Sequence, residues 1–187
     1  MNATATRPVI TVPEYWDDAC RHLVKSDRVM KRLIPQFGQA RLESRGDAFV
    51  TLARSIVGQQ ISVKAAQTVW DRFTQLSRRL TPSQVLKLKV DDMRAAGLSA
   101  RKVEYLVDLA LHFEQGQVSV KAWTQMSDDD IINELVAIRG IGRWTAEMFL
   151  IFHLMRPNVL PLDDVGLING VSRNYFSGEA VSRSEVR

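Results

Sequence analysis

Two short motifs in the second half of the chain contain residue types that could carry chemistry. The first is Arg139-Gly140-Ile141-Gly142-Arg143, in which two glycines flank one apolar residue and two arginines flank the glycines. The second is Asp163-Asp164, a pair of carboxylates that follows a proline-marked corner. Such carboxylates either take part in acid–base catalysis or cap the next helix, and the residues alone leave both interpretations open.

The glycine motif predicts an anion-binding turn between two helices. Gly140 and Gly142 permit a tight turn that a residue with a Cβ would not adopt cheaply. Because a helix follows the turn, several unpaired amide N–H groups would converge where the helix dipole is positive. A backbone phosphate suits such a site, and its binding would be sequence-independent and salt-dependent. The alternative is a plain helix–helix turn that uses glycine as a C-cap.

The two helices that would hold this turn have clear boundaries in the sequence. Ser127 and the three aspartates after it form a helix start, with a capping oxygen and negative charge at the positive end of the dipole. The second helix, 144–155, is apolar on nearly all sides and is therefore expected to be buried. A proline at position 157 ends it. We therefore define a hairpin region, residues 128–155, followed by a segment 157–170 that contains Asp164.

The remainder of the chain is also predicted to be helical. No stretch alternates apolar and polar residues in a way that indicates a sheet, and about ten short helices with short connections describe the chain best. A Gly58-Gln59-Gln60 break separates two of these helices, and Ser62 and Ser99 are expected to cap the helices that follow them. The other predicted helices are 13–25, 27–34, 46–57, 63–76, 82–88, 91–96 and 100–113.

The composition is ordinary for a globular protein and excludes several kinds of site. Of the 187 residues, 45% are hydrophobic and 25% charged. A single cysteine excludes an internal disulfide framework and a four-cysteine cluster, and the three histidines lack metal-ligand spacing. The longest apolar run is too short to cross a membrane, and no signal peptide is recognisable. The net charge of +4 indicates nucleic acid only weakly. We expect an intracellular protein, cytoplasmic or associated with the nucleoid.

At this point the motifs resemble a known family. The sequence LVAIRGIGRWTAEMFLIF (135–152) resembles the helix–hairpin–helix of the base-excision DNA glycosylases, and VLPLDDVGL (159–167) is similar to the Pro-Asp segment that follows it. Within that superfamily the resemblance is closest to the DNA-3-methyladenine glycosylase II family, which SIVGQQIS (55–62) and AAGLSARKVEYL (95–106) also resemble. The resemblance covers residues 49–170. It implies an all-α helix–hairpin–helix glycosylase fold of two helical lobes with the active-site cleft between them.

The resemblance also implies an enzyme that flips alkylated purines, such as 3-methyladenine and 7-methylguanine, out of DNA and hydrolyses their N-glycosidic bond. Asp164 matches the catalytic carboxylate, which would stabilise positive charge on the sugar and orient or deprotonate the attacking water. Asp163 would cap the next helix. Trp144 stands where glycosylases that also cut the backbone carry a lysine, so no lyase step is expected. Its indole suits a cationic base, and Met148, one turn on, would share the pocket.

Double-stranded DNA with damaged bases is the partner that the resemblance implies. The loop at 58–60 would enter the minor groove, and Gln60 would fill the gap left by the flipped base. The expected DNA contacts are Gln59, Gln60, Ser62, Arg101, Gly140, Ile141, Gly142, Arg143 and Thr145. Further candidates for phosphate contacts are Arg54, Lys64, Lys102 and Arg139. No cofactor is expected, although hairpin carbonyls could hold a monovalent cation, and a monomer is the default.

The chain departs from the family pattern towards its ends. Residues 1–45 are expected to form an N-terminal strap and helices that pack on the helical core, and residues 46–187 to form the glycosylase region. That region is expected to lack the usual C-terminal helix, which would leave an apolar patch near the first helices. Two alternatives remain open: a helix–hairpin–helix protein that binds lesions without catalysis, and a glycosylase for oxidised or deaminated bases.

Overall fold

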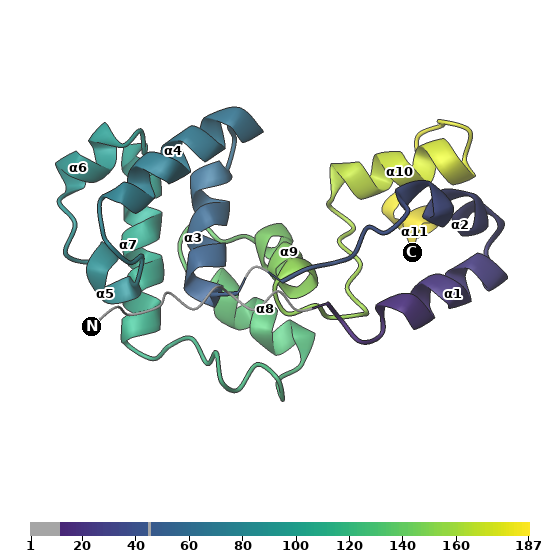
Figure 1. Cartoon of the computed structure of the whole chain (residues 1–187), viewed down its shortest axis with the longest axis horizontal. Helices are drawn as coiled ribbons and strands as arrows, with labels where there is room; N and C mark the ends of the chain where they lie inside the picture. Colours follow the sequence, from purple (N-terminus) through teal and green to yellow (C-terminus); the bar gives the residue numbers. More distant parts are fainter. Residues whose placement is uncertain (1–11, 45) are drawn as a thin grey trace. The chain divides into compact units, whose positions relative to one another are not determined.

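The computed structural model describes residues 12–44 and 46–187, and within that part of the chain all regular structure is helical (Figure 1). The predicted all-α class is confirmed. The chain divides into two compact units. One unit is residues 46–149, and the other combines residues 1–45 with residues 150–187. The sequence-based division instead grouped residues 150–187 with 46–149. Part of the predicted N-terminal strap, residues 1–11, lies outside the described residues.

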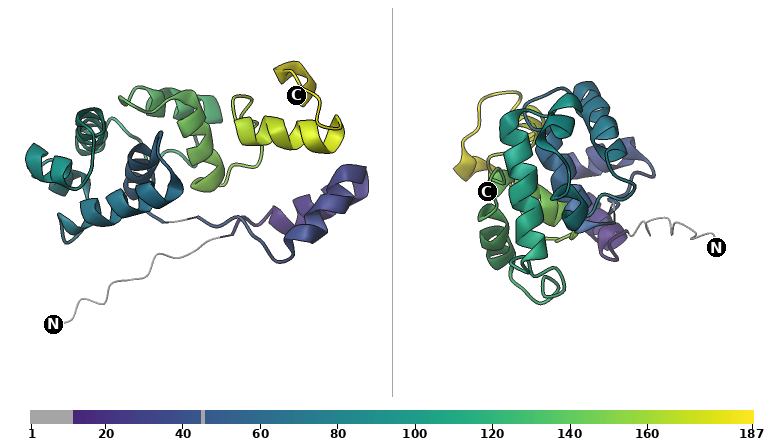
Figure 2. Two further views of the ribbon diagram at one scale, coloured as in Figure 1. Left: turned by 90° about the horizontal axis from the view of Figure 1, so that it is seen from above. Right: turned by 90° about the vertical axis from the view of Figure 1, so that its left-hand side faces the viewer.

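In the unit 46–149, a long helix, α7 (Ala100–Glu114), is the central element. It packs against α3, α5 and α6, and α3 also packs against α4 (Figures 1 and 2). The other helices of this unit are α3 (Ala48–Gly58), α4 (Val63–Gln75), α5 (Pro82–Val85), α6 (Val90–Ala95), α8 (Asp128–Val136) and most of α9 (Arg143–Phe152).

The apolar faces of these helices meet in one core. Their fully buried side chains include Leu52, Ile56, Phe73, Leu106, Leu109, Ile131 and Leu135. Trp123, in the connection before α8, is also buried, and its Nε1 donates to Glu134 Oε1 at 2.7 Å. Burial of an indole is favourable when its N–H finds an acceptor, so this bond lets Trp123 cover α8. The core thus fixes α8, the first helix of the hairpin, and α7, which contacts the hairpin turn through Tyr105 and Asp108.

Serine caps set the starts of three helices in this unit. Ser62 Oγ accepts from Ala65 N at 3.3 Å, and Ser99 Oγ accepts from Lys102 N at 3.2 Å. Ser127 Oγ accepts from Asp130 N at 3.2 Å. All three predicted caps are confirmed. A cap oxygen satisfies an amide that the helix itself leaves unpaired, which is why these starts could be recognised from local sequence.

Helix α9 differs from its prediction in both length and burial. It runs from Arg143 to Phe152 rather than from 144 to 155. Phe149 and its neighbours on one side are buried, but Trp144 is 46% exposed and Phe152 is 53% exposed. The expectation of a helix buried on nearly all sides is therefore wrong. A helix without charged residues can lie in the core or at the surface, because apolar side chains are common in both places. The sequence therefore does not show which of its apolar side chains are buried.

The second unit contains α1 (Trp16–Ser26), α2 (Arg28–Leu33), the 3₁₀ helix η1 (Ile34–Phe37), α10 (Val165–Tyr175) and α11 (Arg183–Val186). Helix α1 packs on α2, and α10 on α11. Arg32 Nη2 donates to Asn174 Oδ1 at 3.3 Å, which joins α2 to α10. In the described residues, no helix is long and apolar enough to cross a membrane.

Candidate functional site

The hairpin turn lies between α8 and α9 and is closed by its own backbone. Ile138 N donates to Leu135 O and Ile141 N donates to Ile138 O, each at 3.1 Å. Gly142 O accepts from Ala146 N at 3.0 Å, so α9 begins directly after Gly142. The Ile141 side chain is buried and anchors the turn. The predicted hairpin is present, and its first α9 amides lack intrahelical partners, as at any helix N-terminus.

The two glycines of the turn have different roles. Gly140 has φ +85°, and a Cβ placed on it would lie 2.2 Å from Cδ2 of Tyr105, on α7. The Tyr105 ring therefore occupies the space that any side chain at 140 would need. A Cβ on Gly142 would have no atom within 4 Å. Gly140 thus allows close packing, whereas Gly142 leaves open main chain at the start of α9. From the sequence, both glycines were expected to permit the tight turn, and nothing in the sequence pointed to Tyr105.

Helix α7 and the loop after α3 hold the hairpin through hydrogen bonds. Asp108 Oδ2 accepts from the Arg139 backbone N at 2.8 Å. Gln59 Nε2 donates to the Gly140 carbonyl O at 2.8 Å. The predicted DNA-contact residue Gln59 therefore joins the 58–62 loop to the hairpin. Gln60, beside it, is exposed and has φ +57°.

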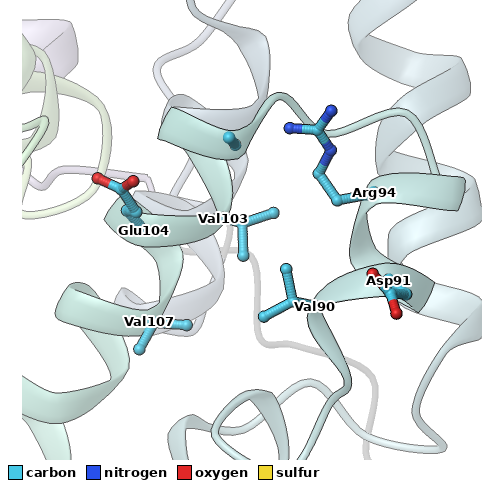
Figure 3. A pocket seen from close by; sticks show the side chains of 7 residues that line it. Val90, Asp91, Arg94, Val103, Glu104 and Val107 are labelled. Carbon is cyan, nitrogen blue, oxygen red and sulfur yellow. The ribbon is translucent and has the colours of Figure 1, made fainter.

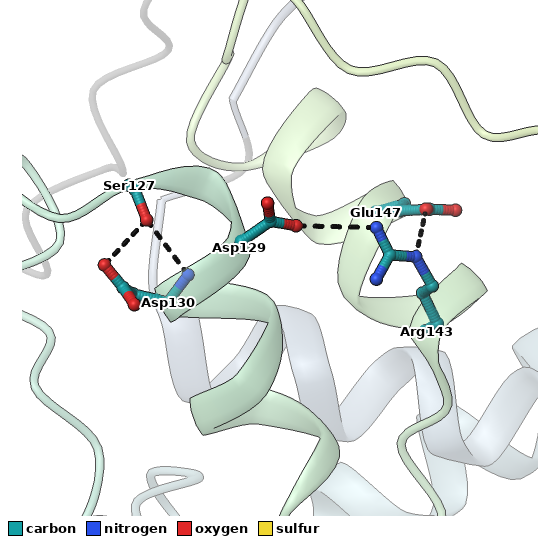
Figure 4. A network of polar contacts seen from close by, with 5 residues as sticks. All are labelled: Ser127, Asp129, Asp130, Arg143 and Glu147. Carbon is teal, nitrogen blue, oxygen red and sulfur yellow. Dashed lines mark hydrogen bonds and ion pairs between the residues drawn. The ribbon is translucent and has the colours of Figure 1, made fainter.

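The side chain of Arg143 is held by carboxylates within the hairpin (Figure 4). Its Nε donates to Glu147 Oε1 at 3.0 Å, and its Nη2 lies 3.5 Å from Asp129 Oδ1. Glu147 is only 7% exposed, whereas the Arg143 side chain is 60% exposed. Arg143 therefore links the first turns of α8 and α9. Thr145, which was expected to offer a hydroxyl to DNA, is buried.

The other basic candidates fall into two groups. Three of them bond to other residues of the chain: Lys102, Arg54 and Arg139. Lys102 Nζ donates to Val57 O at 2.7 Å. Arg54 donates to Gln67 and stacks over Trp70, and Arg139 pairs with Glu104. Lys64 and Arg101 are exposed in the first turns of α4 and α7. Arg101 stands next to the Ser99 cap, at a second helix start that faces solvent.

The predicted base-pocket residues lie on one side of α9. Trp144 is in the first turn and is exposed, and Met148, four residues on, is half-buried. Residues four apart are neighbours on a helix surface, so the two side chains share a face as predicted. The hairpin turn, the 58–62 loop and Trp144 all belong to the unit 46–149.

The aspartate pair belongs to the other unit, where Asp164 is the N-cap of α10. Its Oδ1 accepts from Leu167 N at 2.6 Å. Asp163 forms an ion pair with Arg183 of α11. The expectation that Asp163 caps the helix is therefore wrong, because α10 begins at Val165 and the cap is the residue directly before it. The hydrogen bond fixes the orientation of the Asp164 carboxylate, which is half-buried.

A separate hollow lies between α6 and α7, lined by Val90, Asp91, Arg94, Val103, Glu104 and Val107 (Figure 3). It contains none of the predicted site residues. No group of three or more His, Cys, Asp or Glu side chains among residues 12–44 and 46–187 is arranged to hold a metal ion. The cation at the hairpin carbonyls stays a prediction.

Comparison with known proteins shows the family to which this chain belongs. A model of the HhH-GPD superfamily of base excision DNA repair proteins matches residues 53–187, which include the hairpin and both aspartates. The chain belongs to this superfamily. DNA-3-methyladenine glycosylase 1 of Schizosaccharomyces pombe is 35% identical over 156 residues, covering 80% of this HhH-GPD chain and 68% of that protein.

Two further comparisons agree. The DNA-3-methyladenine glycosylase of Saccharomyces cerevisiae is 30% identical over 190 residues, covering 92% of this chain and 64% of that protein. The structure of the S. pombe 3-methyladenine DNA glycosylase in complex with abasic DNA matches with a TM-score of 0.80 at 32% identity, covering 90% of this chain and 85% of that one. The predicted family and the HhH-GPD fold are confirmed. The chain spans 68% and 64% of the two curated relatives, which are therefore longer.

Proposed function

We propose that this protein is a monofunctional DNA glycosylase that removes alkylated purines from double-stranded DNA. The observation that carries the proposal is the exposed indole of Trp144 in the first turn of α9, in a chain whose relatives are named DNA-3-methyladenine glycosylases. A tryptophan cannot form the Schiff base that a lyase needs, so water is the nucleophile. An indole face attracts a cationic alkylated ring, which contributes about 0.5–2 kcal/mol.

The DNA backbone would be bound by main chain and by two helix starts. At the hairpin, the open space beside Gly142 lets a phosphate approach the first amides of α9. At α7, the exposed Arg101 and the capped helix start offer a second phosphate site. The 58–62 loop would enter the minor groove, where the Gln60 amide can hydrogen-bond the base left without a partner. Because Arg143 is paired with two carboxylates, its main-chain amide is the better phosphate ligand.

Asp164 would supply the charge that promotes bond cleavage. The water oxygen attacks C1′ of the deoxyribose while the C1′–N bond breaks and its electron pair leaves with the base, which turns the cationic alkylpurine into a neutral product. The proton of the attacking water passes to the Asp164 carboxylate and then to solvent. A carboxylate about 4 Å from the developing positive charge contributes roughly 4 kcal/mol at an effective dielectric near 20, or about three decades in rate.

A strand-cleavage assay tests the proposed function. The protein is incubated with a duplex that carries one alkylated purine, and half of each sample is then treated with hot alkali. We expect strand cleavage only after alkali, because hydrolysis leaves an intact abasic site. Cleavage without alkali would mean a lyase. Binding without any cleavage would mean a lesion-binding protein, and either result would contradict the proposal.

Gly166 gives a second test, because it makes room for the Asp164 carboxylate. A Cβ on Gly166 would lie 3.0 Å from Asp164 Oδ1. In Gly166→Ala, alanine favours α10 by up to about 1 kcal/mol but crowds that oxygen. Because the crowded oxygen also accepts the cap bond from Leu167 N, the two effects on α10 oppose each other and we expect little net change in thermal stability. The single-turnover rate of base release should fall about tenfold or more, as for a misplaced catalytic group. Gly170→Ala, also in α10 with no atom within 4 Å of its Cβ, is the control and should keep the wild-type rate.

A further inference from the structure

The loop that carries Gln60 is short and has an unusual backbone. It joins α3, which ends at Gly58, to α4, which begins at Val63. Gln60 has φ +57°. Residues other than glycine rarely adopt this backbone conformation, and it persists where neighbouring contacts impose it. Its own side chain is exposed. The restraint on the loop must therefore come from the residues around Gln60.

Two side-chain hydrogen bonds supply that restraint, one from Lys102 and one from Gln59. Lys102, in the first turn of α7, donates from Nζ to the Val57 carbonyl in the last turn of α3, at 2.7 Å. A cation at a helix C-terminus satisfies an unpaired carbonyl and interacts favourably with the dipole. Lys102 is partly buried, and burial lowers the pKa of its ammonium group from the usual value. The Lys102 ammonium group therefore bonds the last turn of α3 instead of extending into solvent.

Gln59 fixes the other side of the loop. Its Nε2 donates to Gly140 O at 2.8 Å, and Gly140 is itself packed against Tyr105 of α7. Lys102 lies between Arg101 and Val103, directly after the proposed phosphate-binding start of α7. The loop is thus tied at its α3 end to α7 and at Gln59 to the hairpin. All of these residues belong to the unit 46–149.

We propose that Lys102 and Gln59 are positioning residues that hold the 58–62 loop in one conformation, so that Gln60 is ready to fill the gap left by a flipped base. This inference rests on the proposed function, because only a base-flipping protein must insert this loop into the duplex. A loop that is already ordered pays less conformational entropy on insertion. Lys102 therefore acts through the loop and does not itself contact DNA.

Amide hydrogen exchange of the free protein tests the restraint without any DNA. Lys102→Met keeps a long apolar stem but removes the donor, and Gln59→Leu removes the bond to Gly140. Both variants should raise exchange of the amides at 58–61 by about tenfold, since the loop would open locally. Arg101→Met, which removes a neighbouring exposed charge, should leave exchange in the loop unchanged. Lys102→Arg, which keeps a cationic donor, should restore part of the protection.

Single-turnover excision and DNA affinity then test whether the ordered loop is used. Lys102→Met and Gln59→Leu should slow base release about 10- to 100-fold. Their affinity for undamaged DNA should stay closer to that of wild type than the affinity of Arg101→Met does, because neither side chain is a proposed phosphate contact. Gln60→Ala should slow base release equally without any change in loop exchange. If Lys102→Met fails to unfold cooperatively, Gln59→Leu carries the test.

Unchanged exchange in both variants would overturn the proposal, whatever their excision rates. Raised exchange with a wild-type rate of base release would overturn it as well, because the order of the loop would then serve no purpose in the reaction. Raised exchange in a protein whose wild type releases no alkylated base would instead contradict the proposed function, and would leave the restraint by Lys102 and Gln59 standing.

Discussion

Asp164→Asn is expected to slow base release about 1000-fold while DNA binding is retained, because the neutral amide cannot stabilise the positive charge on the sugar. The cap of α10 can survive this substitution. Asparagine caps helices as well as aspartate does, so the bond from Leu167 N to the side-chain oxygen can be kept. Asp164→Ala would lose both functions and destabilise the helix by about 1 kcal/mol.

Single-turnover kinetics at saturating protein, together with the melting temperature of each variant, measure the effect. Asp163→Asn is the matched control, since it neutralises the adjacent carboxylate and breaks only its exposed ion pair with Arg183. Such pairs contribute about 0–1 kcal/mol, so this variant should fold and release bases at close to the wild-type rate. Full activity in Asp164→Asn, or an equal loss in both variants, would contradict the role of Asp164.

Gly140→Ala is expected to have the largest effect on stability. The new Cβ would need the space of the Tyr105 ring, and alanine would have to adopt φ +85°. Left-handed backbone costs about 1–2 kcal/mol for a residue with a side chain, and overpacking adds about 1–3 kcal/mol, so we expect a loss of about 2–5 kcal/mol. Urea denaturation measures this free energy of unfolding.

Gly142→Ala is the control, because its Cβ would meet open space. It should cost less than about 1 kcal/mol, the scale of a cap substitution. Affinity for DNA should nevertheless fall, since the methyl group keeps a phosphate away from the α9 amides. Gly140→Ala combined with Tyr105→Ala should be less destabilised than the sum of the two single variants. Equal stability losses for Gly140→Ala and Gly142→Ala would contradict the separate roles of the two glycines.

The sequence predicted those parts of the fold that depend on local chemistry. Ser62, Ser99 and Ser127 each accept a hydrogen bond from an amide three residues on, so their caps could be recognised from a few neighbouring residues. The hairpin and the all-helical class follow from glycine placement and helical spacing. The assignment of the cap to Asp163 failed because two adjacent aspartates satisfy the same local rule, and only the register of α10 distinguishes them.

The contacts that position the candidate site could not be predicted in this way. Gln59 and Gly140 are 81 residues apart, Lys102 and Val57 are 45 apart, and Arg139 and Asp108 are 31 apart. Nothing in the local sequence around Lys102 distinguishes a lysine that holds a carbonyl from one that binds a phosphate. Local sequence did not predict the exposure of Trp144 either, because apolar residues on a helix indicate a core in most proteins.

The most direct test is a panel of duplexes that differ only in one base, assayed with wild type and with Asp164→Asn. The panel contains alkylated purines, an oxidised purine, a deaminated base and an undamaged control. We predict that wild type releases the alkylated purines as free bases, leaving alkali-labile sites, and that Asp164→Asn loses this release about 1000-fold while it still binds the same duplexes. Preferential release of the oxidised or deaminated base, or equal release of the alkylated purines by both proteins, would contradict it.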